Sequence, residues 1–178
     1  VFVKRDGGAA DLFLQRIDGA KPIPLTADCA QDDTDPEFSP DGRTIAYRSE
    51  CGGGGIFVMG ATGESSRRVT DFGYAPAWSP DALELAVVTE DSGPPTSRNS
   101  LSELWAVRLD SGARRRVSHY DAMAPTWSPD GRRIAFWGLR EETFQRDLWS
   151  VAADGSESAK EAAVSIVDDP AIDWAPVY

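Results

Sequence analysis

The stretch Pro36-Glu37-Phe38-Ser39-Pro40-Asp41-Gly42 decides the fold, because the chain repeats it. It returns as Pro76-Ala77-Trp78-Ser79-Pro80-Asp81-Ala82 and as Pro125-Thr126-Trp127-Ser128-Pro129-Asp130-Gly131, and a fourth copy begins with Pro176-Val177-Tyr178. The aromatic residue of each copy stands at position 38, 78, 127 or 178, so the copies are spaced by 40, 49 and 51 residues. Repetition at this period is typical of solenoids and propellers rather than of a globule without internal symmetry.

Each Ser-Pro-Asp-Gly segment predicts a tight turn between two strands. Proline presets φ for the second turn position, aspartate suits the third, and glycine takes the left-handed conformation that follows. The second copy has Ala82 in place of this glycine, so we expect an alanine in the left-handed region, at a cost of about 1 kcal/mol, or a different turn type. The turn aspartates, Asp41, Asp81 and Asp130, are interpreted as structural residues that hold the turn.

Three short apolar segments follow each turn and predict strands, with hairpin signals between the second and the third. An aromatic residue fills the same slot of the second segment in each repeat, namely Phe13, Phe57, Trp105 or Trp149. The predicted strands cover residues 43–49, 55–60 and 67–70, then 83–89, 103–110 and 115–118, then 132–138, 147–152 and 164–167. With the segment before each turn, this gives four short antiparallel strands per repeat. The predicted fold class is therefore all-β, a β-propeller of four-stranded antiparallel blades with about four blades in this chain, and Trp78, Trp105, Trp127 and Trp149 are predicted to lie in its core.

The repeats divide residues 1–178 into units at about 1–35, 36–75, 76–124 and 125–175, with a further unit starting at 176. The first unit lacks its innermost strand, and the last segment, 173–178, resembles one. Two arrangements follow from this: residues 173–178 complete the first blade and close a ring, or the chain is an excerpt of a six- to eight-bladed propeller. Open strand edges in an excerpt predict self-association or a partner that covers them.

The repeats resemble those of TolB-type propellers. The likeness rests on the three Ser-Pro-Asp turns, the strands after them, the segment Asp147-Leu148-Trp149 and the Arg-Arg-Val-Thr/Ser endings, and it covers essentially the whole chain. A narrower likeness, in residues 56–78 and 173–178, is to the C-terminal propeller of bacterial membrane Ser/Thr protein kinases. This resemblance implies a sensor or interaction domain, and the chain itself shows no phosphate-binding glycine loop and no His-Arg-Asp motif.

The formal net charge is −11 at pH 7. Nucleic acid is an unsuitable partner for such a chain, because binding to it requires a basic footprint. Acidic surfaces attract cations or basic protein surfaces instead. No stretch of the sequence is apolar over the length of a membrane span, so we expect no direct membrane insertion.

Two cysteines are present, Cys29 before one of the turns and Cys51 after it. Both fall in loops that a propeller places on the same face, so a disulfide between Cα atoms within about 7 Å is expected. Two free thiols are the alternative. A disulfide favours an extracytoplasmic or periplasmic location.

Aspartates gather in the loops that lead into the blades, and Asp35, Asp71, Asp121 and Asp169 are the candidates for binding a ligand or cation. Carboxylates that converge on one mouth would be oxygen ligands for Ca²⁺. The alternative is that they terminate strands and stay hydrated. Two longer loops, 90–102 and 139–146, are candidates for a binding rim or for spacers, and the single histidine, His119, is interpreted as a loop residue.

The sequence thus predicts a non-catalytic module that binds a protein, peptide or small ligand on its loop face, with no obligatory cofactor. The alternative is the propeller that gates a serine peptidase of the prolyl-oligopeptidase kind. An enzyme with its own site on this chain is disfavoured, because only one histidine is present and no Gly-x-Ser-x-Gly motif occurs.

Overall fold

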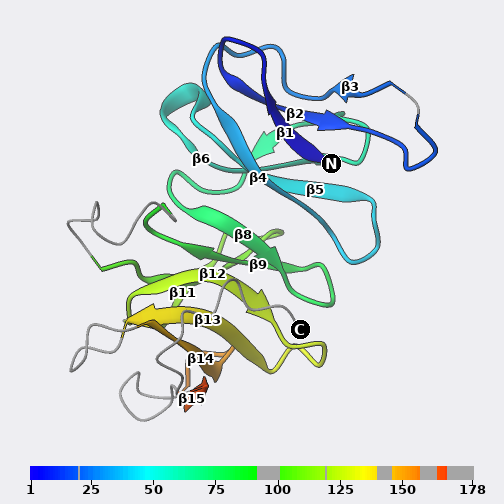
Figure 1. Ribbon diagram of the computed structural model, residues 1–178. Coiled ribbons are helices and arrows are strands. Elements are labelled where there is room, and N and C mark those ends of the chain that lie inside the picture. Colours follow the sequence, from blue (N-terminus) through cyan, green and yellow to red (C-terminus); the bar gives the residue numbers. More distant parts are fainter. Residues whose placement is uncertain (20, 92–100, 119, 140–145, 157–163, 168–178) are drawn as a thin grey trace.

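The computed structural model describes residues 1–19, 21–91, 101–118, 120–139, 146–156 and 164–167. These residues form four antiparallel sheets, which we call blades 1 to 4 (Figure 1). The strands are β1 (Phe2–Arg5), β2 (Ala10–Leu14) and β3 (Ile23–Pro24) in blade 1; β4 (Asp33–Phe38), β5 (Thr44–Ser49), β6 (Gly55–Gly60) and β7 (Arg67–Arg68) in blade 2; β8 (Tyr74–Trp78), β9 (Glu84–Val88), β10 (Leu104–Arg108) and β11 (Arg114–Ser118) in blade 3; and β12 (Ala122–Trp127), β13 (Arg133–Leu139), β14 (Arg146–Ala152) and β15 (Val164–Val167) in blade 4. One 3-10 turn, η1 (Cys51–Gly53), follows β5.

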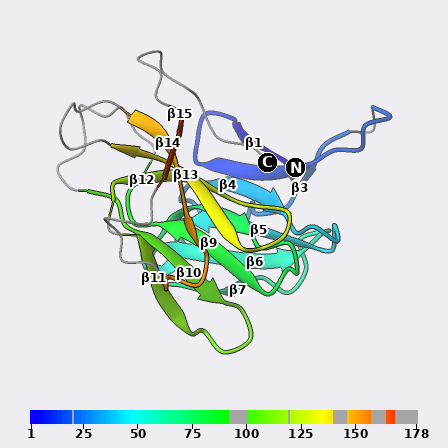
Figure 2. The ribbon, with the colours of Figure 1, turned by 90° about the horizontal axis from the view of Figure 1, so that it is seen from below.

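Strands succeed one another in chain order within every blade, which is the up-and-down arrangement of a propeller blade. The first strands of neighbouring blades contact each other, β4 against β8 and β8 against β12. The sheets follow one another in chain order from β1 to β15, and the succession can be followed in two views (Figures 1 and 2). The predicted fold class is confirmed: blades 2 to 4 are four-stranded antiparallel sheets, and blade 1 has three strands among the described residues.

The three Ser-Pro-Asp turns have the same geometry. In the first, the Ser39 hydroxyl donates to Asp41 Oδ1 at 2.6 Å, and the backbone N–H groups of Arg43 and Thr44 donate to Asp41 Oδ1 and Ser39 Oγ at 3.1 and 3.0 Å. Equivalent bonds hold the turns at Ser79–Asp81 and Ser128–Asp130. The hydrogen bond from the serine hydroxyl is the main reason why the pKa of each turn aspartate is lowered. These aspartates have the structural role that the sequence predicted.

Ala82 adopts the same left-handed backbone conformation as the glycines of the other two turns, and this conformation is strained for alanine. Its φ is 58°, against 69° and 71° for the glycines at the same place in the other two turns, Gly42 and Gly131. An L-residue with a Cβ is disfavoured in this region.

Replacing Ala82 with glycine should therefore stabilise the protein by up to about 1 kcal/mol, because the left-handed conformation then carries no Cβ penalty. Chemical denaturation of the two proteins would measure the difference. Gly131→Ala is the matched reverse change, and it should destabilise by a similar amount. If Ala82→Gly destabilised the protein instead, side-chain packing of Ala82 would outweigh its backbone strain.

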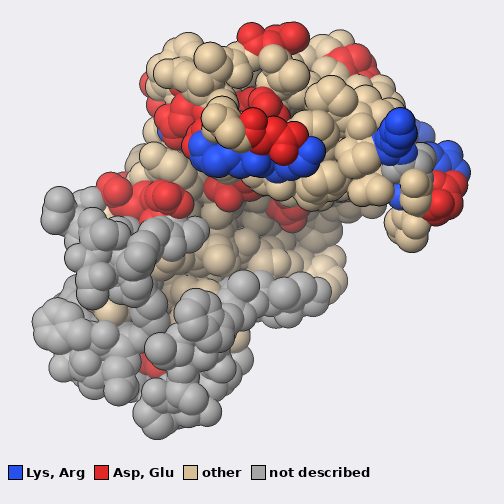
Figure 3. Space-filling model, turned by 45° about the horizontal axis from the view of Figure 1, so that its top comes forward, with Lys and Arg blue, Asp and Glu red and all other residues tan. Residues whose placement is uncertain are grey.

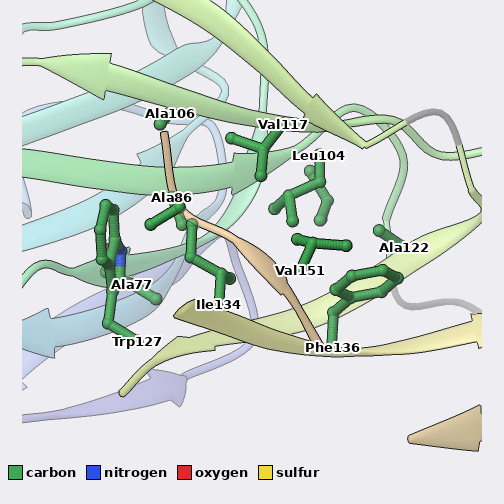
Figure 4. Packing of buried hydrophobic residues seen from close by; sticks show 12 residues of the cluster. Ala77, Ala86, Leu104, Ala106, Val117, Ala122, Trp127, Ile134, Phe136 and Val151 are labelled. Carbon is green, nitrogen blue, oxygen red and sulfur yellow. The ribbon is translucent and has the colours of Figure 1, made fainter. Parts of the chain in front are cut away.

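The core lies between successive blades and consists of alternating residues of their inner strands. In the cluster between blades 3 and 4, Phe136 and Ile134 of β13 pack with Leu104 of β10 and Val151 of β14 (Figure 4). All four are at most 2 % exposed, as the period-2 pattern of the strands requires. Burial between sheets thus joins each blade to the next.

The repeated tryptophans occupy two environments. Trp78 and Trp127, on the innermost strands, are 6 % and 8 % exposed, so the prediction that they lie in the core is confirmed. Trp105 and Trp149 occupy equivalent places on β10 and β14 but are only half-buried. Both pack against a core cluster, as predicted, although part of each side chain is exposed.

Trp78 and Trp127 also join the backbones of neighbouring blades. The indole N–H of Trp78 donates to the carbonyl oxygen of Glu37 on β4 at 3.1 Å, and that of Trp127 donates to the carbonyl oxygen of Ala77 on β8 at 3.2 Å. Both bonds run from one blade to the residue just before the aromatic of the preceding blade. The Pro-x-aromatic phrase therefore encodes the joint between blades as well as the turn.

Candidate functional site

The blades have two ends, and we call the one with the longer connections the loop face. The loop face carries the loops that leave the second strand of each blade and those that enter its first strand; the Ser-Pro-Asp turns lie at the other end, which we call the turn face. The assignment follows from the antiparallel order, since a strand such as β9 begins after a turn and ends in the connection to β10. The loop segments 92–100 and 140–145 lie outside the described residues.

A disulfide joins two of these loops. Cys29 precedes β4 and Cys51 begins η1 after β5, and the structure bonds them with a Cα–Cα distance of 6.4 Å. Beside the bridge, the backbone N–H of Glu50 donates to the carbonyl oxygen of Asp32 at 2.9 Å. The disulfide therefore fixes the entrance of blade 2 to the loop that follows its second strand.

Asp121, one of the predicted ligand-binding aspartates, lies inside the fold. It is 4 % exposed, and its Oδ1 accepts the backbone N–H of Ser102 at 3.0 Å. Asp32 does the same for blade 1, where its Oδ1 accepts the N–H of Ala10 at 2.9 Å. In both cases the loop that enters a blade is tied to the start of the last-but-one strand of the preceding blade, or to the residues just before it, so the placement of Asp121 suits a structural clamp.

Asp71 lies at the surface between blades 2 and 3. Its carboxylate forms an ion pair with Arg114 at 3.0 Å, and that guanidinium also stacks over the ring of Phe72. The nearby arginine contributes to lowering the pKa of Asp71, after a hydrogen bond from its own backbone. The fourth candidate, Asp169, lies outside the described residues, as does His119. Within the described ranges, no three acidic, cysteine or histidine residues are grouped so as to hold a metal ion.

Asp35 lies on the innermost strand of blade 2, at a bulge where the pairing of β4 with β5 shifts. Its φ is 51°, and the residues that precede proline on the next two inner strands, Ala75 and Ala124, have φ of 46° and 42°. Positive φ at residues other than glycine is strained and is maintained only by the surrounding structure. The Asp35 carboxylate accepts the backbone N–H of Ala75 at 3.2 Å, so it connects the two bulges across the blade boundary.

Arg48 stands beside Asp35 and is the only arginine among the buried residues of the described chain. It lies on β5 with 7 % exposure, where the other blades carry Val88 and Trp137. Its guanidinium donates to Glu50 at 2.7 and 2.9 Å and to the carbonyl oxygen of Gly73 at 3.1 Å, and it lies 4.4 Å from the centre of the Tyr74 ring. A buried charge is tolerated only with such partners.

Blade 2 therefore differs from its neighbours in a consistent way at the loop face. Asp35 replaces alanine, Glu37 stands where the other blades have Ala77 and Thr126, and Arg48 replaces an apolar residue. We call the group formed by Asp35, Arg48, Glu50 and Tyr74 the blade-2 cluster. The side chains of Asp35 and Arg48 are not needed to build a blade, since blades 3 and 4 have alanine and apolar residues at these positions, and this makes the cluster the candidate functional site.

The sequence reasoning identified Asp35 but missed Arg48, Glu50 and Tyr74. It searched for residues that recur in the repeats, and recurring residues proved to be turn, core and clamp residues. The signal that was present is the opposite one, namely polar residues that break the repeat at positions where the other copies are apolar. Aligning the copies position by position would have found Arg48.

Desolvation dominates the electrostatics of the three acids on β4, and it raises the pKa of Asp33 as well as those of Asp35 and Glu37. It raises the pKa of Glu37 to about 7, against the stabilising effect of a backbone hydrogen bond from Trp78. Partial desolvation by the surrounding protein also raises the pKa of Asp35, although its side chain still reaches solvent. Asp91 adds to the shift, while the Ala75 N–H and Arg48 oppose it. Glu37 therefore takes up a proton on mild acidification from neutral pH.

We expect the free energy of unfolding to fall as the pH rises from about 4.5 to about 7. In this range Glu37 is ionised in the unfolded chain but stays largely protonated in the folded protein. The folded pKa of about 7 lies above the ordinary 4.5, so the stabilising contribution is complete below the unfolded value and is lost as the pH passes the folded value. In Glu37→Gln, the change in the free energy of unfolding between these two pH values should be smaller by on the order of 1–2 kcal/mol. Urea titrations of both proteins across this range would measure it. Glu64→Gln, at an exposed residue whose pKa is lowered, is the control, and equal slopes for wild type and Glu37→Gln would contradict the assignment.

Comparison with known proteins places the repeats. No family model matches the chain. The Tol-Pal system protein TolB of Anaeromyxobacter dehalogenans is 39 % identical over 105 residues, which cover 58 % of this chain and 21 % of that protein. The solved structure of a putative TolB from Agrobacterium tumefaciens superposes with a TM-score of 0.76 at 27 % identity, over 97 % of this chain and 59 % of that one. The chain thus spans about a fifth of the length of the curated TolB protein.

A peptidase shares part of the likeness. The uncharacterized peptidase YuxL of Bacillus subtilis is 28 % identical over 146 residues, which cover 62 % of this chain and 22 % of that protein. The fold and the repeat together define a β-propeller built from WD-like four-stranded blades. More narrowly, the chain is a TolB-like β-propeller.

Proposed function

We propose that this chain is the non-catalytic binding part of a larger protein and that it holds a protein or peptide on its loop face, at the blade-2 cluster. The observation that carries the proposal is the placement of Asp35 and Arg48. They put an acidic side chain on the bulge, where the other blades have alanine, and a buried cation where the other blades have an apolar side chain. The strained bulge is common to blades 2 to 4, whereas charged side chains that break the local rules of the repeat are a feature of functional sites. The likeness to a Tol-Pal system protein, a protein named for an assembly, supports a protein partner.

The cluster suits a partner with basic or hydrogen-bonding groups. Arg48 has its hydrogen bonds satisfied by Glu50 and Gly73, whereas Asp35 and Glu50 are exposed carboxylates. Acidic side chains recur across the part of the surface shown in Figure 3, beside a row of basic ones. Four aspartates, at positions 35, 71, 121 and 169, are the predicted ligands for a partner or a Ca²⁺ ion. Only Asp35 stays in the proposal, because it alone combines an exposed side chain with a position on the bulge.

An extracytoplasmic location is part of the same proposal, since the Cys29–Cys51 bridge requires an oxidising compartment. The described part of the chain contains no helix that is long and apolar enough to cross a membrane. The sensor role implied by the resemblance to membrane kinases, and the self-association implied by open strand edges, stay predictions. A peptidase gate is the less favoured function, because the likeness to the TolB protein is higher in identity than that to the peptidase YuxL.

A phage-displayed peptide library selected on the immobilised chain tests the proposal. Peptides that bind the wild type should lose at least tenfold in affinity to Asp35→Ala, a change to the alanine that the other blades carry at this position. Asp41→Asn, in a turn on the opposite end, should leave their affinity unchanged. A selection that yields no binders, or binders that do not distinguish Asp35→Ala from wild type, would refute the loop face as the binding site.

A further inference from the structure

A pocket opens on the turn face, between blades 3 and 4, at the end of the molecule opposite the blade-2 cluster. Its volume is about 560 Å³. The turns Ser79–Asp81 and Pro129–Gly131 form two of its walls, Ala153 and Asp154 close a third side, and Glu84, Arg108 and Arg115 line its interior. The pocket belongs to no part of the proposed loop-face function.

The floor is a fixed ion pair. Arg115 binds both carboxylate oxygens of Glu84, at 2.8 and 2.6 Å, and its Nε donates to the carbonyl oxygen of Ala153 in the next blade at 3.0 Å. The Glu84 side chain is 14 % exposed. Arg108 lies 3.8 Å from Glu84 and also pairs with Asp110 at 3.1 Å. Both arginines are therefore already neutralised by protein carboxylates.

The rim adds negative charge and apolar surface, and of its acids Asp130 forms an exposed ion pair with Arg132 at 4.0 Å. Three aspartates line the rim, and in each of them Oδ1 accepts a hydrogen bond from a serine hydroxyl in the same turn: Asp81, Asp130 and Asp154. A serine hydroxyl is the main cause that lowers the pKa of each, so all three are ionised at neutral pH. The charged lining residues are four acids and two arginines, which leaves a net charge of −2. Pro80, Pro129 and Trp127 supply apolar walls.

The equivalent boundary, between blades 2 and 3, has different side chains at the turn face. The positions of Glu84 and Arg108 are taken there by Thr44 and Gly60, and the space beside Gly60 is occupied by the Glu64 side chain. An arginine still bridges the two blades, since Arg67 donates to the carbonyl oxygen of Leu109 at 3.4 Å. The bridge is thus common to both boundaries, whereas the charged floor and the open space are particular to the boundary of blades 3 and 4.

We propose that this inter-blade pocket is a second binding site, which takes the basic side chain of a protein or peptide partner. An arginine or lysine has an apolar stem that fits against Pro80, Pro129 and Trp127 and a cationic head that fits a net acidic rim. The rigid floor and turns hold the carboxylates in place before the partner arrives, which lowers the entropic cost of binding.

A pair of short peptides tests the site, Ac-Pro-Arg-Pro-NH2 and the same peptide with citrulline, which is neutral and nearly isosteric with arginine. The arginine peptide should bind in a calorimetric or NMR titration and should weaken with added salt, while the citrulline peptide should bind at least fivefold more weakly. Loss of one partly exposed charge pair in Asp130→Asn should weaken the arginine peptide about three- to fivefold.

Asp41→Asn is the matched control, because Asp41 makes the same turn hydrogen bonds as Asp130 but does not line the pocket. Equal binding of the two peptides, no binding at millimolar concentration, or the same loss in Asp41→Asn as in Asp130→Asn would each overturn the proposal. Asp35→Ala should leave this peptide's affinity unchanged, so failure here and failure of the loop-face function are distinguishable.

Discussion

Trp127→Ala is expected to destabilise the protein by about 3–5 kcal/mol. The side chain is 8 % exposed and packs in the cluster between blades 3 and 4, and its indole N–H donates to the Ala77 carbonyl oxygen in a buried hydrogen bond. Truncation leaves a cavity and an unsatisfied carbonyl group at the joint between two blades. Urea denaturation followed by circular dichroism would give the change in the free energy of unfolding.

Two further variants, Trp127→Phe and Trp149→Ala, separate the contribution of packing from that of the indole hydrogen bond. Trp127→Phe places at this position the kind of residue that blade 2 has at Phe38, and it should cost about 1–2 kcal/mol, since much of the packing stays and the hydrogen bond is lost. Trp149→Ala should cost clearly less than Trp127→Ala, because Trp149 is only half-buried. A loss below about 1 kcal/mol for Trp127→Ala would mean that the blades are not joined through this residue.

Removing the disulfide is expected to cost about 3 kcal/mol. Cys29 and Cys51 are 22 residues apart in sequence, and closing a loop of this size restricts the unfolded chain by roughly that amount in the loop-entropy model. The Cys29→Ser/Cys51→Ser variant should therefore unfold at a lower temperature than the wild type. Peptide mapping without reduction should recover the two cysteines in one cross-linked fragment.

The reductant dithiothreitol supplies the control. It should lower the melting temperature of the wild type to that of the double serine variant and leave the variant unchanged. After reduction, the segment Cys51–Gly53 should lose protection from hydrogen exchange before the strands do. The disulfide and the Glu50–Asp32 backbone hydrogen bond are the contacts that hold it to the segment before β4. A wild type that is insensitive to reductant would show that the bridge does not form or does not contribute to stability.

Much of the fold follows from local sequence. The Ser-Pro-Asp turns were predictable because their geometry depends on a few adjacent residues, and the structure holds all three with the same bonds, including Ala82 in the left-handed conformation. Strand positions were predictable from alternation, and β6 (Gly55–Gly60) and β15 (Val164–Val167) begin and end where the pattern predicted. The remaining strands differ at their ends by a few residues, since strand ends depend on pairing partners.

The candidate site was predictable only in part. Asp35, Asp71 and Asp121 look alike in the sequence, since all three lie in or beside loops that enter a blade. The structure gives them different surroundings: a strained bulge for Asp35, a surface ion pair for Asp71 and a buried clamp for Asp121. A carboxylate's role depends on which backbone N–H or cation the neighbouring blade presents, and that residue lies 19 to 43 positions away in these three cases.

The sequence by itself determined the repeat, its turns, its strands and the all-β blade, because each of these depends on residues that are close together in the chain. Only the tertiary structure decided which charges are buried or paired. Arg48 became a buried cation because Tyr74 and Gly73 of the next blade meet it, and the pocket at the turn face exists because Glu84 and Arg108 of blade 3 face the turns and Ala153 of blade 4. Contacts between blades join residues tens of positions apart, and the free energy of a charge depends on those contacts rather than on its neighbours in sequence.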